Sequence, residues 1–206
     1  MNYTLYTQDN ADFSNRAHMA ARVGYYPDMF GVDATDIDWD SSTLLETGER
    51  GQVLDGEMGI DRIAQVNVPG LRAPLRVTIQ ERFRRPQYQN CLEVTVTEWL
   101  HNSNRPSELH KIAANLFVYG FYDPTADRLL KAITLNIPAV LLHIIGLSPD
   151  EIDGMRMHWS RKNLDYLKLN NVRMFNNSLV VHRMNWPEPV SSRQTAPHDE
   201  DPCADD

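Results

Sequence analysis

Three residues in the middle of the chain have the types and spacing of a metal-assisted hydrolytic site. Asp61 lies in the run Gly59-Ile60-Asp61, and Gln80 and Arg82 follow it after one predicted turn. Carboxylate and amide oxygens are hard ligands of the kind that Mg²⁺ binds while keeping several waters. Such an ion activates a bound water and polarises a phosphoryl oxygen, and a fixed cation nearby stabilises the developing charge. The pattern predicts phosphodiester hydrolysis with Mg²⁺ or Mn²⁺ as the cofactor.

Two strands must bring these residues together. The strand-like runs Ile60–Val68 and Leu75–Arg84 are separated by the sequence PGLRAP, which is typical of a hairpin connection. Neighbouring strands lie ~4.8 Å apart, so a hairpin of this length can place Asp61 beside Gln80. Alternation along the second strand puts one set of side chains on each face: Thr78, Gln80, Arg82 and Arg84 on one, and Val77, Ile79, Glu81 and Phe83 on the other.

This arrangement resembles the PD-(D/E)XK nuclease superfamily, and in form its Mrr-like branch, in which the second motif reads Q-x-K. The resemblance covers roughly residues 10–140. It implies an α/β fold with a restriction-endonuclease-like core, a mixed central β-sheet flanked by helices. In that family the aspartate and the second motif residue bind the divalent ion, and the lysine positions or activates water. By position these roles fall to Asp61, Gln80 and Arg82.

The chain departs from the family pattern at two places. Arg82 replaces the lysine, and because a guanidinium stays protonated in proteins it cannot act as a general base. It can still bind phosphate and stabilise charge. The leading helix often supplies a carboxylate in this family, but its middle here reads Arg16-Ala17-His18-Met19.

Other residues are candidates for the missing groups. Lys111, on a helix predicted after the third strand, is a candidate catalytic stand-in for the lysine. Glu81 is a candidate metal ligand if the strand faces the other way, and Asp55 and Glu57 precede the motif. A purely structural alternative is an ion pair between Asp61 and Arg82. No zinc-type spacing of histidines and cysteines is present.

The charge distribution separates a basic middle from two acidic ends. The chain carries a net charge of −8, but residues 1–60 hold eleven acidic and three basic residues, and residues 61–186 hold eleven acidic and sixteen basic ones. Arg72, Arg84 and Arg85 are the candidate nucleic-acid contacts, since phosphate neutralisation dominates the affinity for DNA. The alternative is that these charges form an ordinary solvated surface.

Periodicity and turn residues predict the remaining elements. A helix over Asp12–Tyr25, with an apolar stripe of alanines, Met19 and Val23, is expected to end at Pro27. Strands are predicted over Ser42–Thr47, Leu92–Trp99, Phe117–Tyr122, Leu129–Ile137 and Met174–Val181, and helices over Pro106–Leu116 and Ala139–Ile145. Together these elements favour an α/β domain with a mixed sheet.

The predicted organisation is one nuclease-like domain over residues 1–186 and an acidic, proline-containing flexible tail over residues 187–206. No apolar run approaches the roughly 20 residues that span a bilayer. Two distant cysteines, Cys91 and Cys203, fit a reducing compartment. We therefore expect a cytoplasmic protein without a membrane segment.

The leading hypothesis is a Mg²⁺-dependent deoxyribonuclease that acts on DNA, with a homodimer as a possible assembly. The alternative is a non-catalytic protein on the same fold, with a decayed site, that binds DNA or a protein. A third class is a phage or mobile-element protein that blocks a nucleic-acid enzyme, compatible with the acidic first 60 residues and tail.

Overall fold

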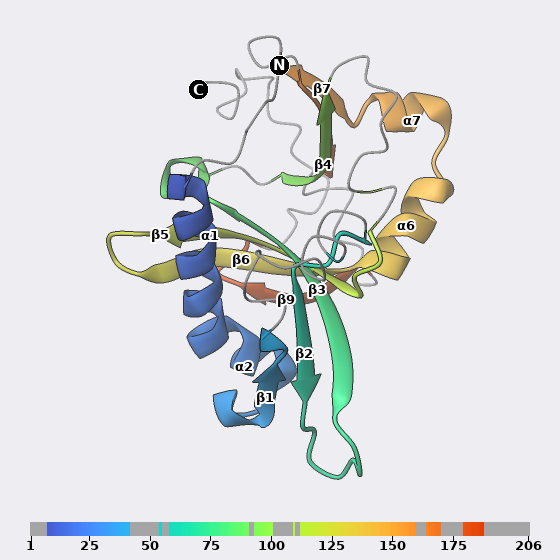
Figure 1. The fold of residues 1–206 in the computed structure, drawn as a ribbon. Coiled ribbons are helices and arrows are strands. Elements are labelled where there is room, and N and C mark those ends of the chain that lie inside the picture. Colours follow the sequence, from blue (N-terminus) through green and yellow to red (C-terminus); the bar gives the residue numbers. More distant parts are fainter. Residues whose placement is uncertain are drawn as a thin grey trace.

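The computed structural model describes residues 8–41, 54, 58–90, 93–100, 109, 112–159, 164–169 and 179–187. Over these residues the chain has a mixed α/β architecture, which confirms the predicted class. A six-stranded sheet forms its centre, with helices beside it and a smaller sheet above it in the view of Figure 1.

The central sheet is mixed, and the motif strands lie inside it. Its order is β1-β2-β3-β5-β6-β9. Only β3 and β5 pair in parallel, which requires a long connection between them, and every other neighbouring pair is antiparallel. The strands are β1 (Ile37–Trp39), β2 (Arg62–Val66), β3 (Leu75–Arg84), β5 (Leu116–Asp123), β6 (Arg128–Asn136) and β9 (Val180–Met184).

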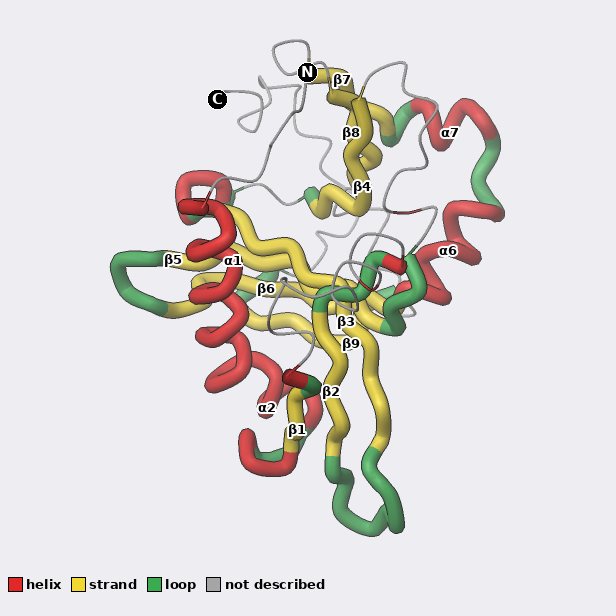
Figure 2. Tube along the Cα trace, in the orientation of Figure 1, coloured by secondary structure: helices red, strands yellow, loops and turns green. Residues whose placement is uncertain are grey.

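The strand expected over Leu92–Trp99 is present as β4 (Val94–Leu100), but it does not belong to the central sheet. It pairs antiparallel with β8 (Leu164–Leu169), which pairs antiparallel with β7 (Arg156–Trp159). The order of this three-stranded sheet is β4-β8-β7, and Figure 2 shows it apart from the larger sheet. Its other strands lie more than fifty residues further along the chain, so local sequence patterns do not reveal the pairing.

The N-terminal helices α1 (Gln8–Ala20) and α2 (Tyr26–Phe30) are joined by the π-helical turn η1 (Ala21–Tyr25). The prediction that Pro27 ends the helix is wrong. Pro27 lies in the first turn of α2, where its missing N–H has no intrahelical role. The helix ends at Gly31, whose φ of +66° is a left-handed cap.

The buried face of α1 and η1 carries fewer apolar residues than the predicted stripe. Ala17, Ala21 and Tyr25, four residues apart, are buried, whereas Met19 and Val23 are 52% and 77% exposed. At about 100° per residue, a side chain two positions along lies roughly 200° away, on the opposite side of the helix. Tyr25 and Tyr26 instead fill the core against this face of the sheet, with Val66, Ile79 and Val118.

A second core cluster lies on the other face of the central sheet. Side chains of β5 and β6 pack there with Val94 and Leu167 of the smaller sheet and with α6 (Ile137–Ile145). Asn136 caps α6 by accepting from the Ala139 amide at 3.2 Å. The following helix α7 (Pro149–Asp153) begins with a capping box formed by Ser148 and Glu151. Two short 3-10 turns, η2 (Ala34–Asp36) and η4 (Pro86–Tyr88), precede β1 and follow β3.

Several other predictions have a clear outcome. The hairpin, the aromatic strand, the strand after it and the helix over Ala139–Ile145 are confirmed as β2–β3, β5, β6 and α6. The end of the helix predicted over Pro106–Leu116 is wrong, because residues 112–115 are not helical and Leu116 begins β5. The late strand begins at Val180 in the described part.

The strand over Ser42–Thr47, the tail after Pro187, Cys91 and Cys203 lie outside the described residues. Among the helices of the described ranges, none has the length and apolar character needed to cross a membrane.

Candidate functional site

The start of β2 brings Asp61 to the motif strand. Gly59 has a φ of +56°, and a Cβ there would lie 3.2 Å from the Cα of Ile112, so the chain turns into β2 at a residue that only glycine suits. The Asp61 amide then donates to the Ile79 carbonyl at 2.9 Å. Because Arg62 pairs with Ile79 in the antiparallel register, the preceding residue, Asp61, stands at the position beside Gln80.

Alternation along β3 is as predicted. Val77, Ile79 and Phe83 belong to the core cluster under α1 and α2. Gln80, Arg82 and Arg84 occupy the alternate positions, in parallel register with Phe117, Tyr119 and Phe121, which lie in the opposite core cluster. Gln80 is 4% exposed, whereas Asp61 and Arg82 are half-buried. The register therefore sets a carboxylate, an amide and a guanidinium at neighbouring positions on one face of the sheet, at the base of the β2–β3 hairpin.

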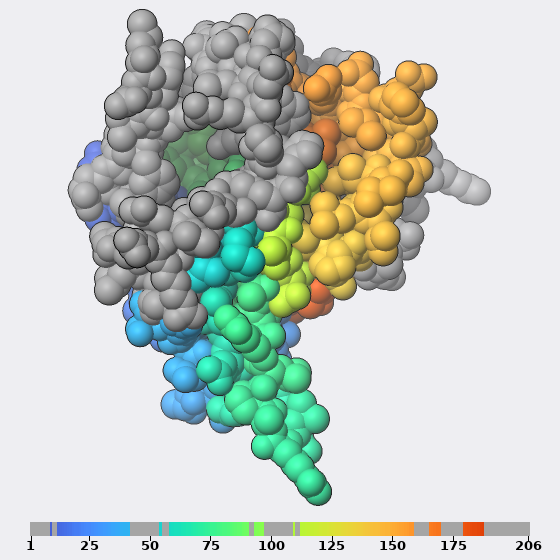
Figure 3. All heavy atoms as spheres, turned by 45° about the vertical axis from the view of Figure 1, so that its right-hand side comes forward, coloured from blue at the N-terminus to red at the C-terminus, as the bar shows by residue number. Residues whose placement is uncertain are grey.

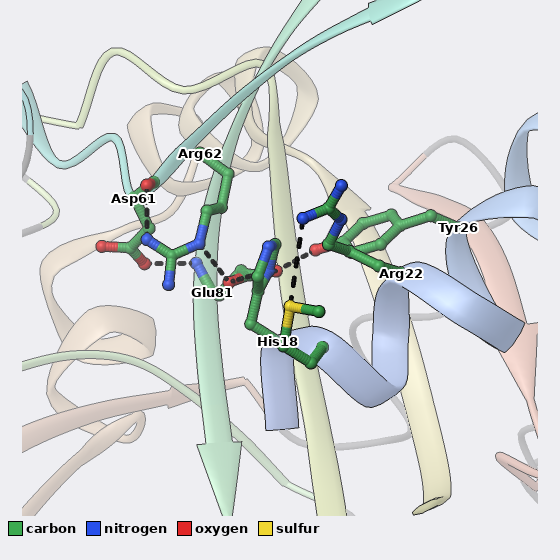
Figure 4. A network of polar contacts seen from close by, with 7 residues as sticks. His18, Arg22, Tyr26, Asp61, Arg62 and Glu81 are labelled. Atoms are coloured by element: carbon green, nitrogen blue, oxygen red, sulfur yellow. Dashed lines mark hydrogen bonds and ion pairs between the residues drawn. The ribbon is translucent and has the colours of Figure 1, made fainter. Parts of the chain in front are cut away.

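The Asp61 carboxylate is held by the backbone of the motif strand. Its Oδ2 accepts from the Glu81 amide at 2.6 Å, and the Arg62 Nη1 donates to the Asp61 carbonyl at 2.9 Å. The second carboxylate oxygen points away from this network (Figure 4). Charge-assisted hydrogen bonds of this kind fix a carboxylate in one orientation.

Glu81 lies at the centre of a buried polar network between the sheet and the helices. The His18 Nδ1 donates to its two carboxylate oxygens at 2.9 and 3.0 Å, and the Tyr26 hydroxyl donates to Oε1. Arg62 Nε forms an ion pair with Oε2 at 3.4 Å. The side chains of His18, Arg62 and Glu81 are 2%, 5% and 6% exposed. Figure 4 shows the three donors directed at Glu81 from α1, α2 and β2.

The network shifts the pKa of two of its members. Burial raises the pKa of Glu81, but His18, Arg62 and Tyr26 together outweigh burial and lower the pKa below its usual value. Burial and the neighbouring Glu81 charge raise the pKa of Tyr26 well above its usual value. The carboxylate is therefore ionised and the phenol neutral near neutral pH.

The carboxylate of Glu81 is occupied by its buried neighbours. Its oxygens accept hydrogen bonds from His18 and Tyr26 and form an ion pair with Arg62, and a cation bound to them would have to displace these partners. Its side chain also lies on the opposite face of β3 from Gln80. Sequence reasoning missed His18, Tyr26 and Arg62 as its partners. The available signal was a histidine on the alanine-rich face of the leading helix, at the place where a carboxylate was sought.

The predicted cationic residues do not form one patch. Arg72 lies at the tip of the β2–β3 hairpin, and Arg84 ends β3, a strand about 30 Å long at about 3.3 Å per residue. The Arg84 guanidinium lies over the Tyr88 ring at 5.2 Å, and that of Arg85 lies over the Phe13 ring at 4.9 Å. Lys111, Asp55 and Glu57 lie outside the described residues.

Asp61 and Gln80 supply a carboxylate and an amide oxygen, the donor types that Mg²⁺ prefers, and the Gln80 oxygen is buried. Both side chains offer hard oxygens on one face, and two protein ligands are within the range usual for this ion. No group of three His, Cys, Asp or Glu side chains suited to a metal is found in the described ranges. Mg²⁺ does not require such a group, because it usually keeps several of its waters.

Comparison of the chain with protein-family models, with curated proteins and with solved structures finds no match.

Proposed function

We propose that this protein is a metal-dependent deoxyribonuclease with a PD-(D/E)XK-type site at the base of the β2–β3 hairpin. One observation carries the proposal: the register of β2 and β3 sets Asp61 beside Gln80, with Arg82 two residues further along the same face. The leading helix packed on the sheet and the mixed strand order support the resemblance on which the assignment of roles rests.

Each residue of the site has a distinct role in this proposal. Asp61 and Gln80 hold Mg²⁺ or Mn²⁺, which when bound activates water and polarises the phosphoryl group. Arg82 stays protonated, so it binds a phosphate oxygen and stabilises the charge of the transition state rather than removing a proton. The Glu81 amide fixes the orientation of the Asp61 carboxylate.

Cleavage of supercoiled plasmid and of labelled single-stranded and duplex oligonucleotides with Mg²⁺ or Mn²⁺ tests the proposal. Asp61→Asn should lose cleavage at least 100-fold while keeping the wild-type melting temperature in EDTA. Asp38→Asn is the matched control, because Asp38 is an exposed aspartate on the adjacent strand β1, in register with Gln65 of β2. Asp61→Asn protein that cleaves as fast as Asp38→Asn protein would refute the site.

The second candidate is a non-catalytic DNA- or protein-binding protein on the same fold. The replacement of the family lysine by Arg82 favours it, because no general base is then supplied at that position. Titration of Mn²⁺ during thermal unfolding separates the two candidates, since a ligand selective for the folded state raises its melting temperature. A wild-type protein that binds DNA but shows neither a metal response nor cleavage would favour the second candidate.

A further inference from the structure

The β2–β3 hairpin projects from the rest of the described chain as an arm, which we define as residues 67–76. Figures 1 and 3 show it extending well beyond the body. Its bend is a turn over Val68–Leu71, closed by the Leu71 amide on the Val68 carbonyl at 3.0 Å. Pro69 and Gly70, with a φ of +89°, are the central residues that a type II turn requires. The bend is therefore a regular β-turn closed by a hydrogen bond.

The side chains of the arm are exposed to solvent and are therefore open to contact with another molecule. All residues from 69 to 76 are exposed. Leu71 and Leu75, near its tip, are 53% and 50% exposed. Single exposed leucines are common on protein surfaces, but here two lie on one narrow projection, where no part of the described chain covers them.

The charge of the arm indicates the chemistry of its partner. The nineteen residues between Asp61 and Glu81 contain three arginines and no acidic residue, in a chain whose net charge is −8. Arg72 and Arg76 are the exposed members, and the third, Arg62, is buried in the Glu81 network. A cationic projection with an apolar tip is complementary to a nucleic acid, which offers phosphates at its edge and base surfaces within its grooves.

We propose that the arm enters the major groove of duplex DNA, with Arg72 and Arg76 on phosphates and Leu71 against the base edges. The proposal rests on the proposed function, because the DNA held by the arm is the substrate of the site. The major groove, about 12 Å wide, admits a two-stranded β-ribbon. The β2–β3 ladder ends at the pair Val66 and Leu75, so the arm is the hairpin connection that continues this two-stranded ribbon. The two strands at its base lie ~4.8 Å apart, which leaves room in the groove for the side chains.

The arm and the site share one strand, which relates the bound groove to the position of cleavage. Arg76, Gln80 and Arg82 alternate along β3 and lie on the same face. Six residues from Arg76 to Arg82 span about 20 Å at about 3.3 Å per residue. The phosphate that is cleaved is therefore expected within about 20 Å of the segment that the arm contacts.

Binding measured without metal separates this proposal from the nuclease activity. Fluorescence anisotropy of a labelled duplex is recorded in EDTA over a range of salt concentrations. The double variant Arg72→Gln/Arg76→Gln should bind more weakly, and the slope of log K against log salt should fall by about two, because each phosphate contact contributes about 0.9. Arg128→Gln/Arg156→Gln removes the same charge from exposed positions on β6 and β7 and should leave the slope nearly unchanged.

Further variants test the groove contact itself. Leu71→Ser should weaken duplex binding without changing the salt slope, because it removes an apolar contact and no charge. Three results would each overturn the proposal. The first is arm variants that bind duplex as well as the control double variant does, and the second is an equal loss of binding in both double variants. The third is an arm variant that loses as much affinity for single-stranded DNA as for duplex DNA. Cleavage that is lost with Asp61→Asn while the arm variants bind normally would refute the arm and leave the nuclease site intact.

Discussion

Replacement of Glu81 by glutamine tests whether the buried network holds the motif strand and the helices together. Glutamine has nearly the same shape, but it removes the negative charge that faces His18 and Arg62 and one of the two acceptor oxygens. Arg62 is then a buried cation without its carboxylate partner, and the Tyr26 and His18 donors compete for the one remaining oxygen.

The magnitude follows from the burial of the network. Breaking a buried ion pair by removing one partner costs about 3–5 kcal/mol. For a chain of this length, each kcal/mol lowers the melting temperature by about 2–4 °C. The variant should therefore melt at least about 6 °C below the wild type at neutral pH. Glu93→Gln is the control, because its ion pair with Lys168 at 3.1 Å involves a carboxylate that is 39% exposed, and pairs of this kind contribute at most about 1 kcal/mol.

The pH dependence gives an independent test with a defined sign. The pKa of Glu81 in the folded protein lies below its usual value of 4.5. Its contribution to the free energy of unfolding is therefore complete above that value and is lost as the pH falls through the folded-state pKa. Glutamine does not titrate, so the difference in stability between the wild type and Glu81→Gln should shrink on acidification. Urea unfolding followed by circular dichroism measures it.

Two results would refute this reasoning. The first is a Glu81→Gln protein as stable as Glu93→Gln protein at neutral pH. The second is a stability difference from the wild type that stays constant as the pH is lowered.

Two further predictions concern the elements that position the site. Gly59→Ala should destabilise the protein by about 1–3 kcal/mol, because the φ of +56° is strained for alanine and the new Cβ would meet Ile112. The control Gly24→Ala lies in a helix with open space around it and should be neutral or stabilising. Thermal unfolding compares the two variants, and an equal loss of stability in both would contradict the backbone argument. Tyr25→Phe should cost about 1 kcal/mol in urea unfolding, because it removes the buried hydrogen bond of 2.6 Å to the Thr134 hydroxyl, and an unchanged midpoint would show that this bond adds nothing to stability.

The hairpin could be predicted from the sequence because the residues that specify it lie close together in the chain. Alternation over Leu75–Arg84 and the proline–glycine turn specify the two strands, their register and the face on which Gln80 and Arg82 lie. The placement of Asp61 beside Gln80 follows from the same register.

The parts that could not be predicted depend on contacts between distant segments. The sheet to which β4 belongs is decided by β8, more than sixty residues later. The role of Glu81 depends on His18, which lies 63 residues earlier on a helix that shows no sequence motif. Pro27 is a helix breaker in most contexts, but here it occupies the first turn of α2, directly after the π-helical turn η1.

The most direct test of the central claim is diffraction from crystals soaked in Mn²⁺, recorded to locate its anomalous signal. We expect one peak within coordination distance of both the Asp61 carboxylate and the Gln80 side-chain oxygen, and its loss in Asp61→Asn crystals. A peak elsewhere, or no peak at a Mn²⁺ concentration that supports cleavage, would contradict the claim that these two strands hold the metal.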